Sequence, residues 1–211
     1  MPPFSAPTLY DTAPTFHHGV SVSSTISLSS SPSRQILADV EFVSNNDMNG
    51  EGHYTGEINK VTRLPHGRGS LRYTSYEKKN CIAYTGLWEN GLRHGHGSLE
   101  YTTGVYVGNF DRDVREGFGF FRWADGAEYQ GDFSQDTPNG RGKFQRKDGS
   151  TYYGDFKNGH MHGLGTMEYE NGDFGVFNWN NGKILTKSEQ KRSKNRKRWA
   201  KSQPQEEIIL V

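Results

Sequence analysis

The stretch that decides the fold is residues 84–110, which read YTGLWENGLRHGHGSLEYTTGVYVGNF. It contains one five-residue pattern twice: a tyrosine, a glycine and a larger aromatic residue at alternate positions. The whole chain contains this pattern four times, as YTGLW at 84–88, YVGNF at 106–110, YQGDF at 129–133 and YYGDF at 152–156. Recurrence with a period of about 20–50 residues is typical of repeat proteins. The sequence therefore predicts an array of similar units.

Each unit reads as one β-hairpin. Eleven residues after its tyrosine, each unit has a Gly-x-Gly element, at 95–97, 117–119, 140–142 and 163–165. The spacing of two places these glycines and the aromatic residues on one face of a strand, while the residues between them are mostly polar. Turn dipeptides agree with this reading. Asn90-Gly91 and Asn158-Gly159 begin turns inside units, and Asp125-Gly126, Asp148-Gly149 and Asn171-Gly172 predict two-residue turns between units.

Two less regular copies extend the array. An earlier copy runs from Tyr54 to Gly69, and the segment Tyr76–Ala83 separates it from the next one. A sixth copy keeps Trp179 but has Gly175 where the tyrosine is expected. Glycine inside a strand often marks the close approach of another group. We therefore expect the aromatic rings to lie flat across the glycines.

Composition divides the chain into three regions. Residues 1–38 are rich in Ser, Thr and Pro and predict a disordered tail, with phosphorylation as an alternative role. Residues 39–185 form the array, and residues 186–211 are a basic tail. The single cysteine, Cys81, and the absence of a signal-like or membrane-spanning segment favour a cytosolic or nuclear protein.

The units resemble MORN repeats, whose pattern is a Tyr-x-Gly-x-Trp strand, a turn, a Gly-x-Gly strand and an Asp/Asn-Gly turn. The resemblance covers about Tyr54–Lys183 and implies an all-β fold, a single-layer antiparallel meander of stacked β-hairpins. Three positions depart from the pattern: Ile58 in an aromatic position, and Asp113 and Asp136 where the turn glycine is usual. The family mostly acts as protein-interaction scaffolds in cytoskeletal, ciliary or flagellar assemblies, with any catalysis carried by attached domains.

The aromatic row is the first candidate site. A single-layer sheet has no second layer to cover this face, so part of it should stay available to a partner helix, to the chain's own tail or to a second copy. The predicted partner-binding residues are Tyr84, Trp88, Tyr106, Phe110, Tyr129, Phe133, Tyr152 and Phe156.

A second candidate site lies on the other face. Phe118 and Phe120 alternate with the glycines of their strand, so they are expected on the face opposite the aromatic row, near Val107. The equivalent positions of the other units hold mostly polar or charged residues. Two outward phenylalanines predict either a contact patch or a surface covered by another part of the chain.

The basic tail is the third candidate. Its charge is concentrated in a segment that can contact anionic lipid, acidic protein, nuclear import machinery or, as the disfavoured alternative, nucleic acid. These residues are Lys191, Arg192, Lys194, Arg196, Lys197, Arg198 and Lys201. A capping-box pattern, Thr186 followed by Glu189, allows a short helix. Ile208–Val211 can add a strand to a sheet edge or be recognised by a peptide-binding domain.

The sequence contains no G-x-S-x-G, P-loop or H-E-x-x-H motif, and we expect neither a cofactor nor a metal. The His94-x-His96 and His160-x-His162 pairs recur at repeat positions, which favours a structural role over metal binding. The sequence thus predicts a non-enzymatic scaffold, with peripheral lipid binding or a nuclear role as alternatives.

Overall fold

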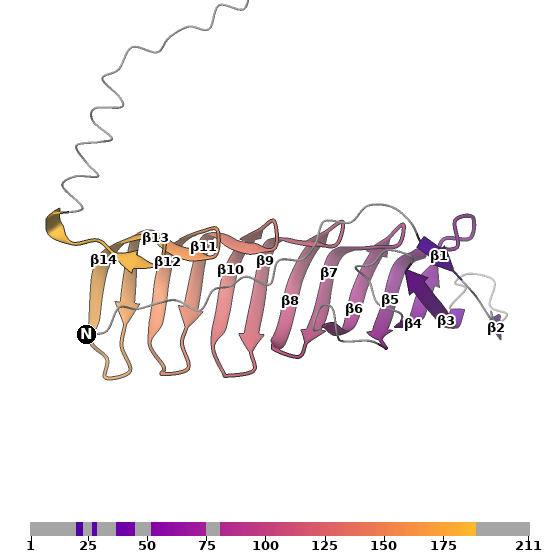
Figure 1. Cartoon of the computed structure of the whole chain (residues 1–211), viewed down its shortest axis with the longest axis horizontal. Coiled ribbons are helices and arrows are strands. Elements are labelled where there is room, and N and C mark those ends of the chain that lie inside the picture. Colours follow the sequence, from indigo (N-terminus) through magenta and orange to yellow (C-terminus); the bar gives the residue numbers. More distant parts are fainter. Residues whose placement is uncertain (1–19, 23–26, 29–36, 45–51, 75–80, 189–211) are drawn as a thin grey trace, which may run out of the picture.

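The computed structural model describes residues 20–22, 27–28, 37–44, 52–74 and 81–188. Its elements are β-strands, and residues 187–188, at the end of the last range, are helical. Figure 1 shows them side by side along one long axis. Their bounds are β1 Val20–Val22, β2 Ser27–Leu28, β3 Leu37–Ser44, β4 Gly52–Ile58, β5 Pro65–Tyr73, β6 Cys81–Glu89, β7 Leu92–Tyr101, β8 Gly104–Asp111, β9 Val114–Trp123, β10 Glu128–Ser134, β11 Thr137–Gln145, β12 Thr151–Lys157, β13 His160–Glu168, β14 Phe174–Asn180 and β15 Lys183–Ile184.

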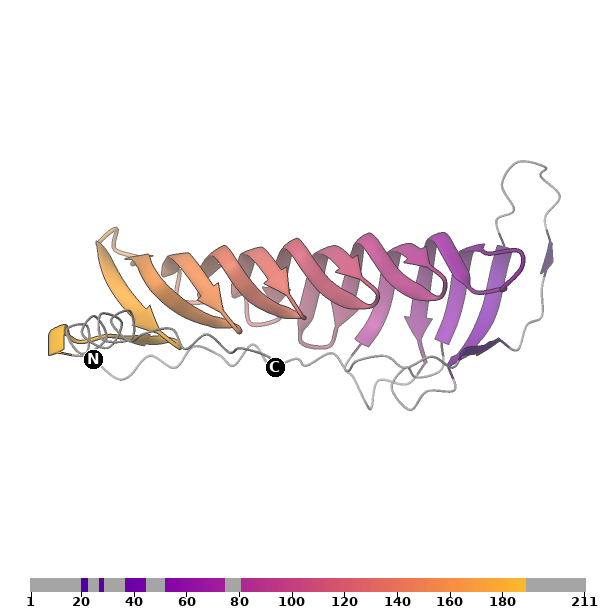
Figure 2. The same ribbon diagram turned by 90° about the horizontal axis from the view of Figure 1, so that it is seen from above.

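The strands form one open sheet. From β3 to β15, each strand pairs with the next in chain order, and the pairing is antiparallel throughout the described strands. Figure 2 shows the same row from above, and none of the described strands forms a second layer over it. This arrangement confirms the predicted single-layer meander of hairpins. The short strands β1 and β2 lie within residues 1–38, where we expected a disordered tail, and both pair with the edge of β3.

The turns inside the units are as predicted, whereas the loops between units differ from the prediction in length. Two-residue turns with positive φ at both positions lie inside the units, as at Asn90 (50°) and Gly91 (86°). Between units, however, Asp125-Gly126 is not a two-residue turn. Trp123 N donates to Ala127 O, so three residues form the loop, and of these only Gly126 has positive φ. Such loops combine a type I turn with a third residue in the left-handed backbone conformation. Glycine suits this third position because it adopts positive φ readily.

The glycines are explained by the tyrosine rings. Glycines face each other across the strand pairs, as Gly86 faces Gly97. A Cβ on Gly97 would lie only 2.6 Å from Cε2 of Tyr84, so a side chain there would overlap the ring. The ring is held in place because Tyr84 Oη donates to Leu87 O at 2.9 Å. The same hydrogen bond, from a tyrosine to the carbonyl three residues later, occurs at Tyr54, Tyr106, Tyr129 and Tyr152.

Neighbouring units are joined by their rings. Tyr84 makes edge-on contacts with Trp88 of its own unit and with Phe110 of the next, at centroid distances of 5.0 and 5.2 Å. This alternation continues along the array to Tyr152 and Trp179, at 5.4 Å. Each such pair contributes about 0.5–1.5 kcal/mol beyond the burial of its area. The rings therefore form a continuous core on one side of the sheet, which we call the aromatic face.

The two aspartates that replace turn glycines form buried ion pairs. Asp113 Oδ1 accepts hydrogen bonds from the backbone N and from Nε of Arg93, at 2.9 and 2.8 Å. Asp136 binds Arg115 in the same way. Burial alone would lower the pKa of Arg93, but the Asp113 carboxylate and nearby hydroxyls raise it above its ordinary value. These departures from the repeat pattern therefore fasten consecutive units together.

The sixth copy exchanges the positions of its glycine and its ring. Gly175 stands where the tyrosine is expected, and Phe177 takes the place of the glycine. A Cβ on Gly175 would lie 2.6 Å from the Phe177 ring, so the ring folds back over the glycine. The irregular copy thus keeps the contact of a ring with a glycine in reversed order.

Candidate functional site

The predicted aromatic row is the core of the protein. All eight side chains, from Tyr84 to Phe156, are at most 5% exposed. We expected part of this row to be open to a partner, and the burial corrects that expectation. The rings of adjacent units cover one another edge to face, so the row needs no second layer. Binding of a partner to these residues stays a prediction, but in this conformation they offer almost no surface.

The tyrosine hydroxyls of this core are suited to structure and not to acid–base chemistry. Burial, with a smaller contribution from Asp155, raises the pKa of Tyr152 to about 12. Its hydroxyl therefore stays protonated at neutral pH and donates to Asp155 O and His162 O.

The other side of the sheet, which we call the open face, carries the accessible side chains. Paired residues of neighbouring strands form a row of side chains across the middle of this face. In this row Ser98 lies opposite Val107, and Val107 lies opposite Phe120. The part near β4 to β7 is rich in hydroxyls, and Ser70 and Thr85 are hydrogen-bonded at 3.0 Å. Most of the large apolar side chains on this face lie from β8 onward, and the exposed ones include Leu87 on β6 and then Val105, Val107, Phe118, Tyr153, Leu164, Phe174 and Val176.

Phe118 and Phe120 lie on the open face, but they differ in exposure. Phe118 is 55% exposed, whereas Phe120 is half-buried and has the Arg122 guanidinium 5.7 Å from its ring centroid. Arg122 is in turn paired with Glu128 at 2.7 Å. Phe118 is therefore the accessible member of the predicted patch. The part played by either residue in binding stays a prediction.

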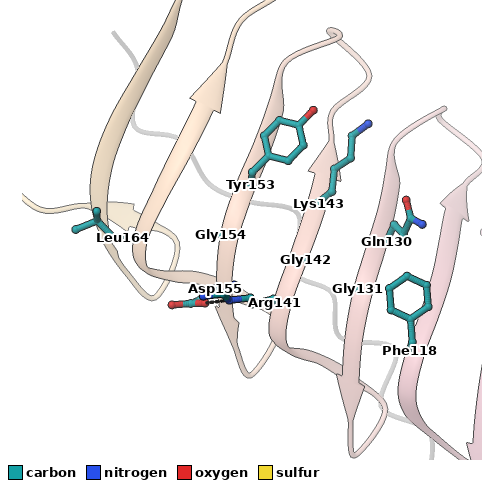
Figure 3. Close-up of a pocket in the computed structure, with 10 residues that line it drawn as sticks. All are labelled: Phe118, Gln130, Gly131, Arg141, Gly142, Lys143, Tyr153, Gly154, Asp155 and Leu164. Atoms are coloured by element: carbon teal, nitrogen blue, oxygen red, sulfur yellow. Dashed lines mark ion pairs between the residues drawn. The ribbon is translucent and has the colours of Figure 1, made fainter.

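Next to Phe118 the open face is hollowed by a shallow depression of about 600 Å³. Its floor includes the backbone of Gly131, Gly142 and Gly154. Figure 3 shows the side chains around it. Phe118 and Leu164 border it, on β9 and β13, and the strands between them contribute Gln130, Arg141, Lys143, Tyr153 and Asp155.

The charged side chains in this depression make only weak contacts with one another. Arg141 Nε lies 4.0 Å from Asp155 Oδ1, and the Arg141 side chain is 93% exposed. Lys143 Nζ stands 5.7 Å from the centroid of the Tyr153 ring. Exposed ion pairs of this kind contribute roughly 0–1 kcal/mol. Both cations are therefore available to an acidic group, beside apolar side chains that would bury area with it.

In the described part of the chain, no group of three or more His, Cys, Asp or Glu is placed so that it could hold a metal ion. His94 lies between two carboxylates, 3.7 Å from Glu89 and 3.5 Å from Asp111. His66 Nδ1 accepts a hydrogen bond from Asn90 N at 3.4 Å. These contacts join neighbouring turns.

The basic residues Lys191–Lys201 and the apolar segment Ile208–Val211 lie outside the described residues, so both remain sequence predictions. In the described ranges no helix is long and apolar enough to cross a membrane.

Sequence reasoning missed Tyr153 and Leu164 as site residues, although their parity already assigns them to the open face. It also missed the depression, because its lining comes from β9 to β13 and depends on the register between them.

Two comparisons bear on the family. No curated protein matches the chain significantly. The family model of the MORN repeat matches four consecutive segments, at residues 84–105, 106–128, 129–151 and 152–174. Each matched segment starts at one of the tyrosines whose ring lies over a glycine pair. Residues 84–174 therefore consist of four consecutive MORN repeats.

Proposed function

We propose that this protein is a non-enzymatic scaffold that holds a protein partner on the open face of its array. The MORN repeat is itself a non-enzymatic repeat consistent with protein or lipid interaction. The observation that carries the proposal is the depression between Phe118 and Leu164, where exposed apolar side chains adjoin Arg141 and Lys143.

The partner surface that fits is apolar with acidic groups. Phe118 and Leu164 are 55% and 65% exposed, so covering them removes apolar area from water. Charge complementarity with the two cations favours an acidic partner over a basic one and orients it. As the cellular setting we propose a cytoskeletal, ciliary or flagellar assembly, a choice that rests on the family resemblance.

Site-specific photo-crosslinking in the native cell tests this proposal. A photoreactive residue at Leu164 should capture a partner, and Phe118→Asp in the same chain should abolish the capture. The matched control places the photoreactive residue at Val61, an apolar residue that is 90% exposed in the turn between β4 and β5. Equal capture from both positions, or capture that survives Phe118→Asp in a folded chain, would count against the open face.

The second candidate function, attachment to anionic lipid through the basic tail, is favoured by the charge of Lys191–Lys201. Each basic residue near such a surface contributes about 1 kcal/mol, and salt screens the attraction. Co-sedimentation with phosphoinositide vesicles should then be lost on truncation after Leu185 and should fade with salt. Phe118→Asp should leave it unchanged, which separates the two functions.

A further inference from the structure

The depression on the open face has the form of a lane that runs across the strands. Its floor is a row of paired glycines, in which Gly142 lies between Gly131 and Gly154. Two neighbouring rows of side chains form its walls, as Figure 3 shows. One wall includes Phe118, Arg141 and Leu164, and the other includes Gln130, Lys143 and Tyr153.

The length of this lane matches about six residues of extended chain. It reaches from Phe118 on β9 to Leu164 on β13, and four strand spacings of about 4.8 Å give about 19 Å. An extended segment advances about 3.3 Å per residue, so six residues cover about 20 Å. The walls are only about 7 Å apart, because they lie two residues apart along each strand, whereas a helix is about 10–12 Å wide. The lane therefore favours an extended occupant over a helical one.

The two cations of the lane stand at its middle, on opposite walls. Arg141 and Lys143 both belong to β11, halfway between β9 and β13. Successive side chains of an extended segment point to opposite sides. Two consecutive acidic residues would therefore place one carboxylate beside Arg141 and the other beside Lys143. Asp155, on β12, is 4.0 Å from Arg141, so the part of the occupant over β12 should be uncharged or a hydrogen-bond donor.

The chain itself contains a segment with these properties. Glu206 and Glu207 are its one pair of consecutive acidic residues, and four aliphatic residues follow them in Ile208–Val211. The residues before the pair, 203–205, read QPQ and are uncharged, with side-chain amides that can donate to a carboxylate. This segment of six residues lies outside the described part of the chain.

The chain leaves the array beside the lane. Leu185 N donates to Asn178 O, and Asn178 lies opposite Leu164. From β15 to β11 there are four strand spacings, about 19 Å. The twenty residues 186–205 span about 25 Å as a flexible linker, so the segment can reach β11 without being stretched. A segment that enters at Leu164 brings its acidic residues to β11 and its aliphatic residues towards Phe118.

We propose that Glu206–Val211 docks in the lane of the same chain and competes with the external partner for it. In this pose the two carboxylates lie beside Arg141 and Lys143, and the aliphatic side chains cover Phe118 and remove its apolar area from water. The docking depends on this chain alone, whereas the competition rests on the proposed function, in which a partner uses the same site. Exposed ion pairs are weak, so the segment can be displaced by a partner that fits better.

Disulfide trapping in the full chain tests the docking. Ile209 follows Glu207 by two residues on the Lys143 wall, which places it near Gln130, the residue opposite Lys143. The chain with Gln130→Cys and Ile209→Cys should therefore form a disulfide within one molecule in oxidised glutathione. The natural Cys81 is buried and stays in every variant.

The matched control for trapping combines Thr166→Cys with Ile209→Cys. Thr166 lies in the same row of the open face, opposite Tyr153, and β13 is closer than β10 to the point where the chain leaves the array. A tail that is only tethered would reach Thr166 at least as often as Gln130. The docked segment should instead react about tenfold faster at Gln130, where its effective concentration is higher.

Charge exchange then tests the contacts of the docked segment. Arg141→Glu with Lys143→Glu should slow trapping at Gln130 about tenfold, because two ion pairs become repulsive. Adding Glu206→Lys with Glu207→Lys should restore the rate, and circular dichroism checks that each variant is folded. Equal trapping at Gln130 and Thr166 overturns the docking, as does a rate that the charge changes leave unaltered. A disulfide between two molecules overturns docking within one chain.

Photo-crosslinking from Leu164 tests the competition separately. Glu206→Lys with Glu207→Lys should increase capture of the partner several-fold, because the competing segment is released. Capture that does not increase overturns the competition. Trapping at Gln130 with no capture from any chain would refute the proposed partner and support the docking, whereas capture without trapping would refute the docking and leave the partner site standing.

Discussion

The identity of single residues in this protein is decided by the space beside a ring. Gly142 lies under the Tyr129 ring, and a Cβ there would be 2.6 Å from both Cε2 and Oη of the tyrosine. The Oη atom also donates to Asp132 O, so the ring cannot move away without losing that hydrogen bond. An alanine at this position therefore either displaces the ring or strains the strand.

We expect Gly142→Ala to lower the free energy of unfolding by about 1–3 kcal/mol, the usual cost of overpacking. In a Tyr129→Ala background the same substitution should be neutral or stabilising, because alanine in a strand is favoured over glycine by about 0.5–1 kcal/mol. Urea unfolding of the four proteins in this cycle measures both effects. Equal costs in the two backgrounds would show that the ring is not the reason for the glycine.

At the scale of the element, one turn residue in each unit is matched to one residue in the unit before it. The turn residue donates its backbone N–H to a carbonyl of the preceding unit, as Gly91 donates to Pro65 and Asp113 donates to Arg93. Where the earlier residue is arginine the turn residue is aspartate, and where it is proline or methionine the turn residue is glycine. The five pairs are Pro65–Gly91, Arg93–Asp113, Arg115–Asp136, Pro138–Gly159 and Met161–Gly182.

Deleting single units tests this matching. Removal of residues 106–128 places Arg93 before Asp136, so the ion pair forms again between the new neighbours. Removal of residues 129–151 places Arg115 before Gly159 and leaves a buried guanidinium without its carboxylate. Both deletions remove one whole repeat of 23 residues.

We expect the second deletion to be less stable than the first by about 3–5 kcal/mol, the cost of breaking a buried ion pair. Thermal unfolding followed by circular dichroism compares the two shortened chains. Equal stability would mean that the ring contacts alone determine which units can be neighbours.

At the scale of the whole molecule, the core is a single row of rings with a tyrosine hydroxyl in each complete unit. Burial is the largest cause that raises the pKa of these hydroxyls above the usual 10, to about 12 for Tyr152. It also raises the pKa of Tyr101, a further buried tyrosine of the core, to about 12. The unfolded chain loses these protons first as pH rises. The contribution of these tyrosines to stability is thus fully present below pH 10 and is lost as the pH rises through about 12.

We therefore expect the fold to be lost cooperatively in this alkaline range. Phenolate absorbance should rise in one step that coincides with the loss of circular dichroism. The same titration in strong urea is the control, and there the phenols should ionise near pH 10. Gradual ionisation near pH 10 in a chain that stays folded would contradict the burial of this row.

The sequence by itself determined the hairpin unit, the face of each residue and the need for glycine beside the tyrosines. These features depend on local spacing, because a period of two assigns faces and a dipeptide such as Asn90-Gly91 sets a turn. Parity alone also placed Phe118 on the open face. The three-residue loops between units were not predicted, because the length of a loop depends on which flanking residues are hydrogen-bonded.

The tertiary structure alone decided which surfaces are available. The aromatic row looked open in sequence, but rings of adjacent units close it edge to face, and contacts between units are not encoded in either unit alone. The pairing of Arg93 with Asp113 and the depression between β9 and β13 likewise depend on register. Local spacing specifies the unit, whereas burial is a property of the stacked array, because each unit is covered only by its neighbours.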